Sequence, residues 1–171
     1  MARDYKLAKE SVPLMITLAD GRKLYASPQD DTQGAFLDLL QNAKKKVRIA
    51  DYSFNLPQFE TILPELVKND IDVKLVLDRS QSFGKTEKAV LASLQTAGVS
   101  IVIGTSSKHK IMHDKFAVID DKCIYGSWNF TTDASAEDNF FVIDTSEVVS
   151  SWFEGVWGQI NNWIIANEPQ S

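Results

Sequence analysis

Hydrophobic residues follow two different spacings along the first two thirds of the chain. Short apolar runs, each bounded by polar residues, are typical of buried strands, whereas apolar residues at intervals of three and four are typical of helices. Because the two kinds of segment alternate, the strands are expected to pair in parallel through helical crossovers. The pattern predicts strands over 47–54, 71–77 and 99–103, and helices from Asp31 or Thr32 to Lys44–Lys46, over 59–67, and over 85–96 up to Gly98.

The two ends of the chain have other rhythms. Asp20-Gly21, between apolar segments at 13–19 and 22–26, predicts an N-terminal β-hairpin. Three strands with short links are predicted over 115–119, 122–125 and 139–143, with Asp120-Asp121 as the first turn. A last helix from Ser146 carries a broad stripe of aromatic and aliphatic residues, which we expect to pack in the core.

These elements predict an α/β fold, a layered sandwich in which helices flank a mixed, largely parallel central sheet. A chain of 171 residues suits one domain over 1–171, with a hairpin extension at 1–26 and a catalytic core at 27–165. No apolar run reaches the roughly 20 residues of a membrane-spanning helix, and no signal peptide is evident. We therefore expect a cytoplasmic protein without stable membrane association.

The net charge of −5 excludes a generally basic nucleic-acid coat, so any contact with a polyanion must be local. One basic cluster combines Lys44–Lys46 with Arg48, and its simplest interpretation is a solvated helix end. The other comprises Lys108, His109, Lys110 and Lys115; Lys108 and Lys110 are candidate substrate ligands. Cys123 is the only cysteine, which excludes an intrachain disulfide and a Cys-rich zinc site.

The candidate chemistry lies in the segments His113–Asp120, which reads H-x-K-x-x-x-x-D, and Gly126–Thr131, which reads G-S-x-N-x-T. Cleavage of a phosphodiester without metal needs a nucleophile, a proton donor and groups that hold the phosphoryl oxygens. His113 can attack phosphorus, and Lys115 lies two residues on, at a spacing that puts both on one face of a strand. Asn129 and Ser127 add uncharged donors.

The two segments together resemble the signature of the phospholipase D superfamily, and more specifically its small single-motif bacterial endonucleases of the Nuc type. The likeness runs from about Ser27-Pro28 to Trp157. It implies a phosphohistidine intermediate on His113, a homodimer that shares one composite active site, and no metal or other cofactor. It also implies phosphate binding by Lys115, Ser127 and Asn129.

The resemblance makes Asp120 part of the catalytic set, as an organiser of the site. Asp138 stands where family members usually have the glutamate that orients the histidine, and Glu137 is the alternative. We therefore predict a metal-independent phosphodiesterase, a non-specific DNA or RNA endonuclease. The alternatives are a phospholipase or cardiolipin-type hydrolase and a catalytically weak nucleic-acid-binding module; an accessory protein could supply specificity.

Several residues near the motif have two interpretations. His109 and His113 have a zinc-like spacing, but no further ligand completes such a site. Asp78 ends a strand, where it could approach substrate or cap a turn, and the cap is favoured. Trp128 and Phe130 could stack on bases, although inward packing is favoured for each.

Overall fold

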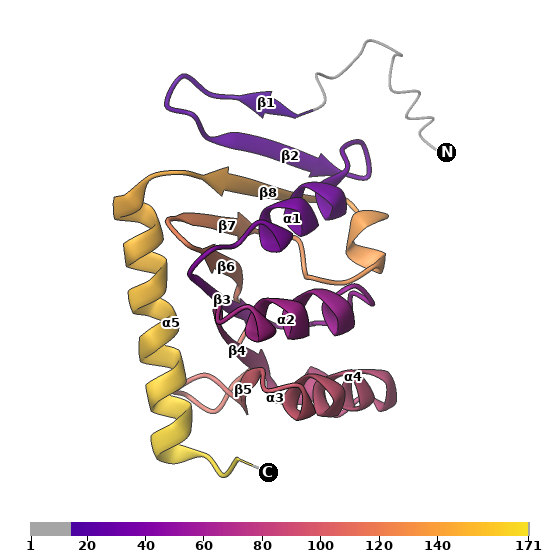
Figure 1. The fold of residues 1–171 in the computed structure, drawn as a ribbon, viewed down its shortest axis with the longest axis vertical. Coiled ribbons are helices and arrows are strands. Elements are labelled where there is room, and N and C mark those ends of the chain that lie inside the picture. The colour runs from indigo at the N-terminus through magenta and orange to yellow at the C-terminus, as the bar shows by residue number, and fades with distance from the viewer. Residues whose placement is uncertain (1–14, 171) are drawn as a thin grey trace, which may run out of the picture.

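One sheet runs through the molecule, and helices cover both of its faces (Figure 1). The computed structural model describes residues 15–170, and within them the sheet has eight strands in the order β1-β2-β8-β7-β6-β3-β4-β5. The strands are β1 Ile16–Thr17, β2 Lys23–Ser27, β3 Lys46–Asp51, β4 Asp72–Asp78, β5 Ser100–Gly104, β6 Lys115–Ile119, β7 Lys122–Gly126 and β8 Asn139–Asp144. The helices are α1 Thr32–Gln41, α2 Phe59–Lys68, α3 Arg79–Ser82, α4 Lys85–Thr96 and α5 Glu147–Asn167, with a 3-10 turn, η1, at Asp133–Ser135.

The α/β class and the mixed, helix-flanked sheet are confirmed, but the sheet is not largely parallel. Parallel pairing is confined to β3–β4 and β4–β5, and the other neighbouring strands are antiparallel. The reason is the length of the connections. A short turn between β6 and β7 can only reverse the chain, whereas a helical crossover returns it in parallel. The strands that are linked by helical crossovers, β3, β4 and β5, therefore form one edge of the sheet, and the other strands pair antiparallel.

The N-terminal hairpin is part of this sheet. Gly21 has φ +90° at its turn, and Ile16 pairs with Leu24. Strand β2 then pairs along its whole length with β8, from Lys23 opposite Ile143 to Ser27 opposite Asn139. The part of the predicted hairpin at 13–14 lies outside the described residues.

Helix α1 begins where the sequence predicts and ends earlier. The Asp31 side chain caps its start by accepting the Gly34 N–H at 2.8 Å. Its end is at Gln41, where the Asn42 N–H bonds to the Asp38 carbonyl. The interpretation of Lys44–Lys46 as a helix end is wrong, because their backbone N–H groups bind the Asp120 carboxylate instead.

A separate apolar layer lies on each face of the sheet. Helices α1, α2 and α4 cover one face, and α5 crosses the other (Figure 1). The α5 stripe packs as predicted: Trp157 is buried, and its Nε1–H donates to the Ile49 carbonyl at 2.9 Å. Trp152 is the exception, with 64% of its surface exposed. The layer under α5 contains Ala50, Val76, Val102, Met112, Phe116, Trp157 and Ile164.

Arg48 of β3 is not available to a polyanion. Its guanidinium lies 5.4 Å from the centre of the Trp157 ring and pairs with the Asp72 carboxylate. Only 8% of the residue is exposed. The basic cluster expected around Lys44–Lys46 therefore loses one of its cations to the packing of α5.

Candidate active site

The C-terminal end of β3 holds both halves of the motif. The Tyr52 N–H donates to the carbonyl of Asp114 at 2.9 Å, which fixes the His113 segment. The preceding carboxylate, Asp51 Oδ2, accepts the N–H of Phe130 at 3.0 Å, which fixes the Asn129 segment. Two segments that are separate in the sequence are thus joined through Asp51, the last residue of β3, and Tyr52, the residue that follows it.

His113 and Lys115 converge on the ring of Tyr52. The His113 and Tyr52 rings meet edge to face with their centroids 4.7 Å apart, and Lys115 Nζ lies 5.2 Å from the centre of the same ring. Lys115 Nζ also donates to the His113 carbonyl at 3.2 Å. His113 is exposed, and Lys115 is half-buried. The expected pair of nucleophile and cation therefore shares one small area at the end of the sheet.

The hydroxyl of Tyr52 is fixed from the other side, where Gln81 Nε2 donates to it at 3.0 Å. Tyr52, Asp51 and Gln81 were not predicted from the sequence as parts of the site. A signal for the first two was present, since they follow the buried run of a strand at its carboxyl end, where ligands bind in open α/β sheets. Gln81 lies in the short helix α3, which the hydrophobic pattern does not reveal.

Burial opposes charge on both members of the Asp51–Lys115 pair, which lie opposite each other on β3 and β6. Burial raises the pKa of Asp51 well above its ordinary value, against the opposing effects of the Phe130 N–H and Lys115. Burial also lowers the pKa of Lys115, while the negative charges of Asp51 and Asp114 act to raise it. A phosphate anion bound at Lys115 would stabilise the charged ammonium and raise its pKa. Binding of an anionic ligand therefore offsets part of the cost of burying this charge.

Asp78 is a cap, as favoured from the sequence, and also an anchor for the His113 loop. It is fully buried at the end of β4, where Oδ1 accepts the Ser80 N–H at 2.8 Å. Its Oδ2 accepts the N–H of Met112 at 2.6 Å. Asp78 therefore holds the residue before His113, as Tyr52 holds the residue after it.

The Gly126–Thr131 segment is organised by packing and by hydrogen bonds to β8. A Cβ on Gly126 would lie 2.2 Å from the Phe140 carbonyl oxygen, so only glycine fits. Ser127 Oγ donates to Asn139 Oδ1 at 3.0 Å and accepts the Phe140 N–H at 3.1 Å. The hydroxyl proton predicted to bind phosphate is thus engaged with Asn139.

Asn129 remains the uncharged candidate ligand of the second segment. Its side-chain oxygen is buried and has no hydrogen-bond partner within residues 15–170. An unsatisfied buried acceptor is unusual in a folded protein. The donor that can bind a phosphoryl oxygen is the Nδ2–H group of the same amide. Its neighbours Trp128 and Phe130 are each only 1% exposed and pack in the core, so neither can stack on a base.

Asp120 lies away from His113. Residue pairing runs antiparallel from Asp51 opposite Lys115 to Val47 opposite Ile119, so Asp120 is at the other end of β6. Asp120 is five residue steps from Lys115 along an extended strand, which corresponds to roughly 16 Å. Its carboxylate accepts the N–H groups of Lys44, Lys45 and Lys46 at 2.9, 2.8 and 3.1 Å. Asp120 therefore organises the strand junction and does not contact the reacting groups of its own chain.

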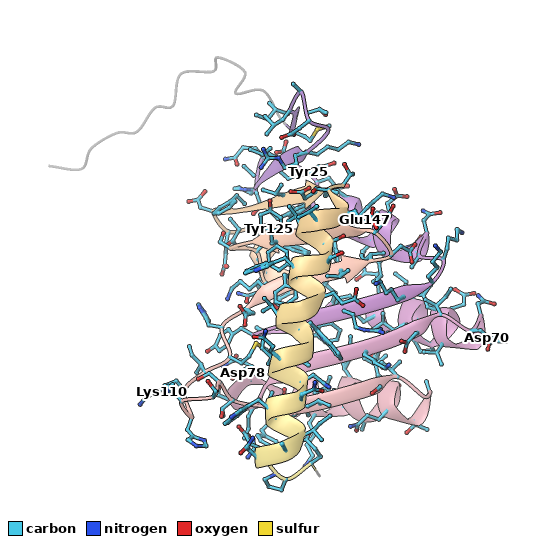
Figure 2. The ribbon with its side chains drawn as sticks, turned by 90° about the vertical axis from the view of Figure 1, so that its left-hand side faces the viewer. Tyr25, Asp70, Asp78, Lys110, Tyr125 and Glu147 are labelled. Atoms are coloured by element: carbon cyan, nitrogen blue, oxygen red, sulfur yellow. The ribbon has the colours of Figure 1, made fainter. Side chains whose placement is uncertain are left out.

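The remaining candidates surround the site without direct contacts to His113. Asp138 and Glu137 are exposed beside η1, and within residues 15–170 neither carboxylate forms a hydrogen bond to His113. Lys108 and Lys110 are exposed on the loop that leads to His113. Figure 2 shows Lys110 on the same side of the molecule as Asp78, opposite Asp70 near the start of β4.

His109 packs against α5. Its ring meets that of Trp163 edge to face, with the centroids 5.5 Å apart. Among residues 15–170, no group of three or more His, Cys, Asp or Glu side chains is placed to hold a metal ion. In the same part of the chain, none of the helices has the length and apolar character needed to cross a membrane.

Comparison with known proteins defines the family. A family model described as "Cardiolipin synthase, PLD-like domain" matches residues 36–157. The chain therefore belongs to the phospholipase D-like family, as the motif indicated. Among curated proteins, a mitochondrial cardiolipin hydrolase of Chlamydomonas reinhardtii is 25% identical over 128 residues, or 71% of this chain. The match spans only 56% of that relative's length.

Solved structures agree with this assignment. Nuc from Salmonella typhimurium, a phospholipase D family member, has a TM-score of 0.76 and 25% identity, covering 84% of this chain and 95% of its own. NucT from Helicobacter pylori has a TM-score of 0.71 and 17% identity, covering 81% of this chain and 94% of its own. The likeness to NucT is one of fold.

Proposed function

We propose that this protein is a metal-independent phosphodiesterase that acts on nucleic acid as a non-specific DNA or RNA endonuclease. The observation that carries the proposal is the convergence of His113 and Lys115 on Tyr52, beside the segment that holds Asn129. A nucleophile, a cation and an amide donor then surround one phosphoryl group. The single motif, shared with the small bacterial endonucleases, favours a nucleic acid among the phosphodiesters.

In the first step of the proposed reaction, a ring nitrogen of His113 attacks phosphorus and forms a phosphohistidine. The bond from phosphorus to the leaving oxygen breaks, and that oxygen takes a proton from a second imidazolium. In the second step, water gives a proton to the second imidazole and attacks phosphorus, which releases His113. Lys115 and Asn129 hold the phosphoryl oxygens through both steps.

We assign the second imidazole to His113 of a partner chain in a two-fold homodimer. The sequence contains only two histidines, and His109 packs on Trp163, so it is not poised beside His113. A two-fold axis through the site would bring two copies of His113 together, and two-fold dimers are the commonest oligomers. We further assign the orientation of His113 in the assembled dimer to Asp138, with Glu137 as the alternative, since a carboxylate beside the ring stabilises the imidazolium. Neither carboxylate bonds to His113 within residues 15–170 of one chain.

Replacement of the nucleophile tests the chemistry. His113→Ala should lower the cleavage of single-stranded DNA and RNA in excess EDTA by at least about 1,000-fold, the scale on which loss of a catalytic nucleophile acts. Lys122→Ala, at the far end of the β6–β7 hairpin, is the matched control and should cleave normally. Undiminished cleavage by the His113 variant, or cleavage that requires added divalent metal, would refute the mechanism.

A second candidate is a cardiolipin-type hydrolase with the same chemistry. The family model and the Chlamydomonas relative favour it, because both carry cardiolipin in their descriptions. Vesicles that contain cardiolipin should be assayed in EDTA beside the nucleic acids, with the His113 variant as the blank. Hydrolysis of lipid without cleavage of nucleic acid would select this function over the first.

A further inference from the structure

A cleft of about 410 Å³ opens directly beside His113. One wall is the loop at 105–114, and the other is the C-terminal half of α5, including Gln159, Ile160 and Trp163. Its size is within the roughly 300–1,000 Å³ of ordinary small-molecule sites. The proposed reaction uses His113 at the edge of this cleft and leaves the rest of it without a role.

The walls suit a flat ring. Met112 and Ile160 supply apolar surface, and Trp163 supplies an aromatic surface. The edge contact with His109 fixes Trp163 from the loop side. Ile111 also lines the cleft and is 49% exposed, which is unusual for a large apolar side chain. Aromatic and apolar walls of this kind hold nucleobases by stacking, whatever the base.

Polar groups in the cleft favour a base over an acyl chain. Ser107 and Gln159 are among its lining residues, and within residues 15–170 neither side chain forms a hydrogen bond. Both can donate to or accept from the edge of a heterocycle. A hydrocarbon chain would remove these groups from water without replacing their hydrogen bonds, which is costly.

The loop that forms one wall of the cleft also carries two cations, which do not line the cleft themselves. It is closed by hydrogen bonds from the Ser106 N–H to the Lys110 carbonyl and from the His109 N–H to the Ser106 carbonyl, both 2.8 Å. This turn exposes Lys108 and Lys110, and Figure 2 shows Lys110 extending outward from the molecule. In a chain of net charge −5, a pair of exposed lysines on the loop that leads to His113 can attract phosphates locally.

We propose that this cleft is a nucleobase-binding subsite for the nucleotide next to the scissile phosphate. The base lies against Trp163, its edge bonds to Ser107 and Gln159, and the flanking phosphates lie near Lys108 and Lys110. The proposal rests on the proposed nuclease function, because it places the base relative to a phosphate at His113. A base that is paired and stacked in a duplex cannot enter, so the subsite favours single strands.

A pair of substrates with identical phosphodiesters isolates the role of the base. One is a single-stranded DNA oligonucleotide, and the other is the same length of abasic tetrahydrofuran residues. Wild-type protein should cleave the first with a kcat/KM roughly 5- to 100-fold higher, the range that stacking of one base supplies. Trp163→Leu should remove most of that ratio by slowing only the base-containing strand, and Trp163→Phe should restore part of it.

Two further variants guard against misfolding. Ile111→Ala removes an exposed side chain and should reduce the same ratio by a few fold. Trp152→Leu is the matched control: it alters an exposed tryptophan of the same helix, eleven residues or roughly 16 Å from Trp163, and should keep the full ratio. A loss of activity on both strands by Trp163→Leu and Ile111→Ala would indicate a structural role and overturn the subsite.

The outcomes separate the subsite from the nuclease proposal. Equal kcat/KM on the two strands in wild-type protein overturns the subsite and leaves the nuclease function standing. Cleavage of neither strand, together with no cleavage of single-stranded RNA, refutes the nuclease function, and the subsite is then judged from binding. Tighter binding of the base-containing strand, lost in Trp163→Leu, would support it, and equal binding would overturn it. If Trp163→Leu slows only cardiolipin hydrolysis, the cleft holds an acyl chain and the proposal is wrong.

Discussion

At the scale of single residues, two buried carboxylates hold the backbone of the segments that carry the candidate site residues. Asp51 and Asp78 are both fully buried at the carboxyl ends of adjacent strands. One accepts the Phe130 N–H and the other accepts the Met112 N–H. Neither reaches the surface, so both act through the backbone of the motif. Burying a carboxylate costs free energy, and such a cost is tolerated where the carboxylate fixes the geometry of a functional site.

The pKa of Asp51 has a consequence for stability. Because that pKa is raised in the folded protein, the folded state keeps the proton to a higher pH than the unfolded chain, in which aspartate titrates near ~3.9. The contribution of Asp51 to the free energy of unfolding therefore falls as pH rises above about 4, until the folded-state pKa is passed. Burial of the charged form is the physical cause.

Asp51→Asn should abolish the fall in the free energy of unfolding that Asp51 causes as pH rises. We expect the variant to become more stable relative to wild type as pH rises from about 4 to 8, by about 1.4 kcal/mol for each unit by which the pKa is raised. Urea unfolding at several pH values measures the difference, with Asp121→Asn as an exposed control. A difference that stays constant with pH would show that Asp51 titrates alike in both states.

At the scale of elements, one carboxylate joins three strands. Asp120 has φ +57° in the turn between β6 and β7, and its side chain binds the backbone at the start of β3. Burial raises the pKa of Asp120, but the N–H groups of Lys46, Lys44 and Lys45 lower it more, so the net shift is downward. The motif aspartate thus fixes the end of β6 that is farther from Lys115.

Asp120→Ala should separate stability from chemistry. We expect the free energy of unfolding to fall by about 2 kcal/mol, the scale of a lost hydrogen-bonded charge, because three backbone donors lose their acceptor. Cleavage per folded molecule should stay within a few fold of wild type. Urea unfolding and assays below the unfolding transition measure the two effects, with Asp121→Ala as the control. A 100-fold loss of kcat without loss of stability would return Asp120 to the catalytic set.

At the scale of the whole molecule, the site of one chain is open. His113 is exposed at the end of the sheet, and the proposed chemistry needs a second imidazole there. A shared site has a quantitative signature in mixed dimers. If each site needs His113 from both chains, one inactive chain silences the whole dimer. Independent sites would lose activity only in proportion to the inactive chain.

Equal amounts of wild-type protein and His113→Ala, unfolded together and refolded, should keep about one quarter of the activity of the same total amount of wild type, because only one dimer in about four pairs two intact chains. Light scattering verifies the dimer, and mixing the proteins without unfolding is the control. Retention of about one half of the activity would contradict the shared site.

Much of the fold was predictable because it depends on local patterns. The limits of α4 and β6 agree with the hydrophobic periodicity, and the caps at Asp31 and Ser146 start their helices as expected. The share of parallel strands was not predictable. The way in which β6 pairs with β3 and β2 with β8 depends on contacts between residues far apart in the chain.

The sequence by itself determined the family and was sufficient to propose His113, Lys115 and Asn129 as site residues, because their chemistry and spacing are properties of short segments. Only the tertiary structure decided which carboxylates support them. Asp120 and Lys115 are five residues apart, but the extended backbone places them at opposite ends of β6. In contrast, Asp51 and Phe130 are distant in sequence and form a hydrogen bond. The cleft beside His113 likewise exists only because α5 crosses the sheet next to the loop at 105–114, a juxtaposition set by long-range packing.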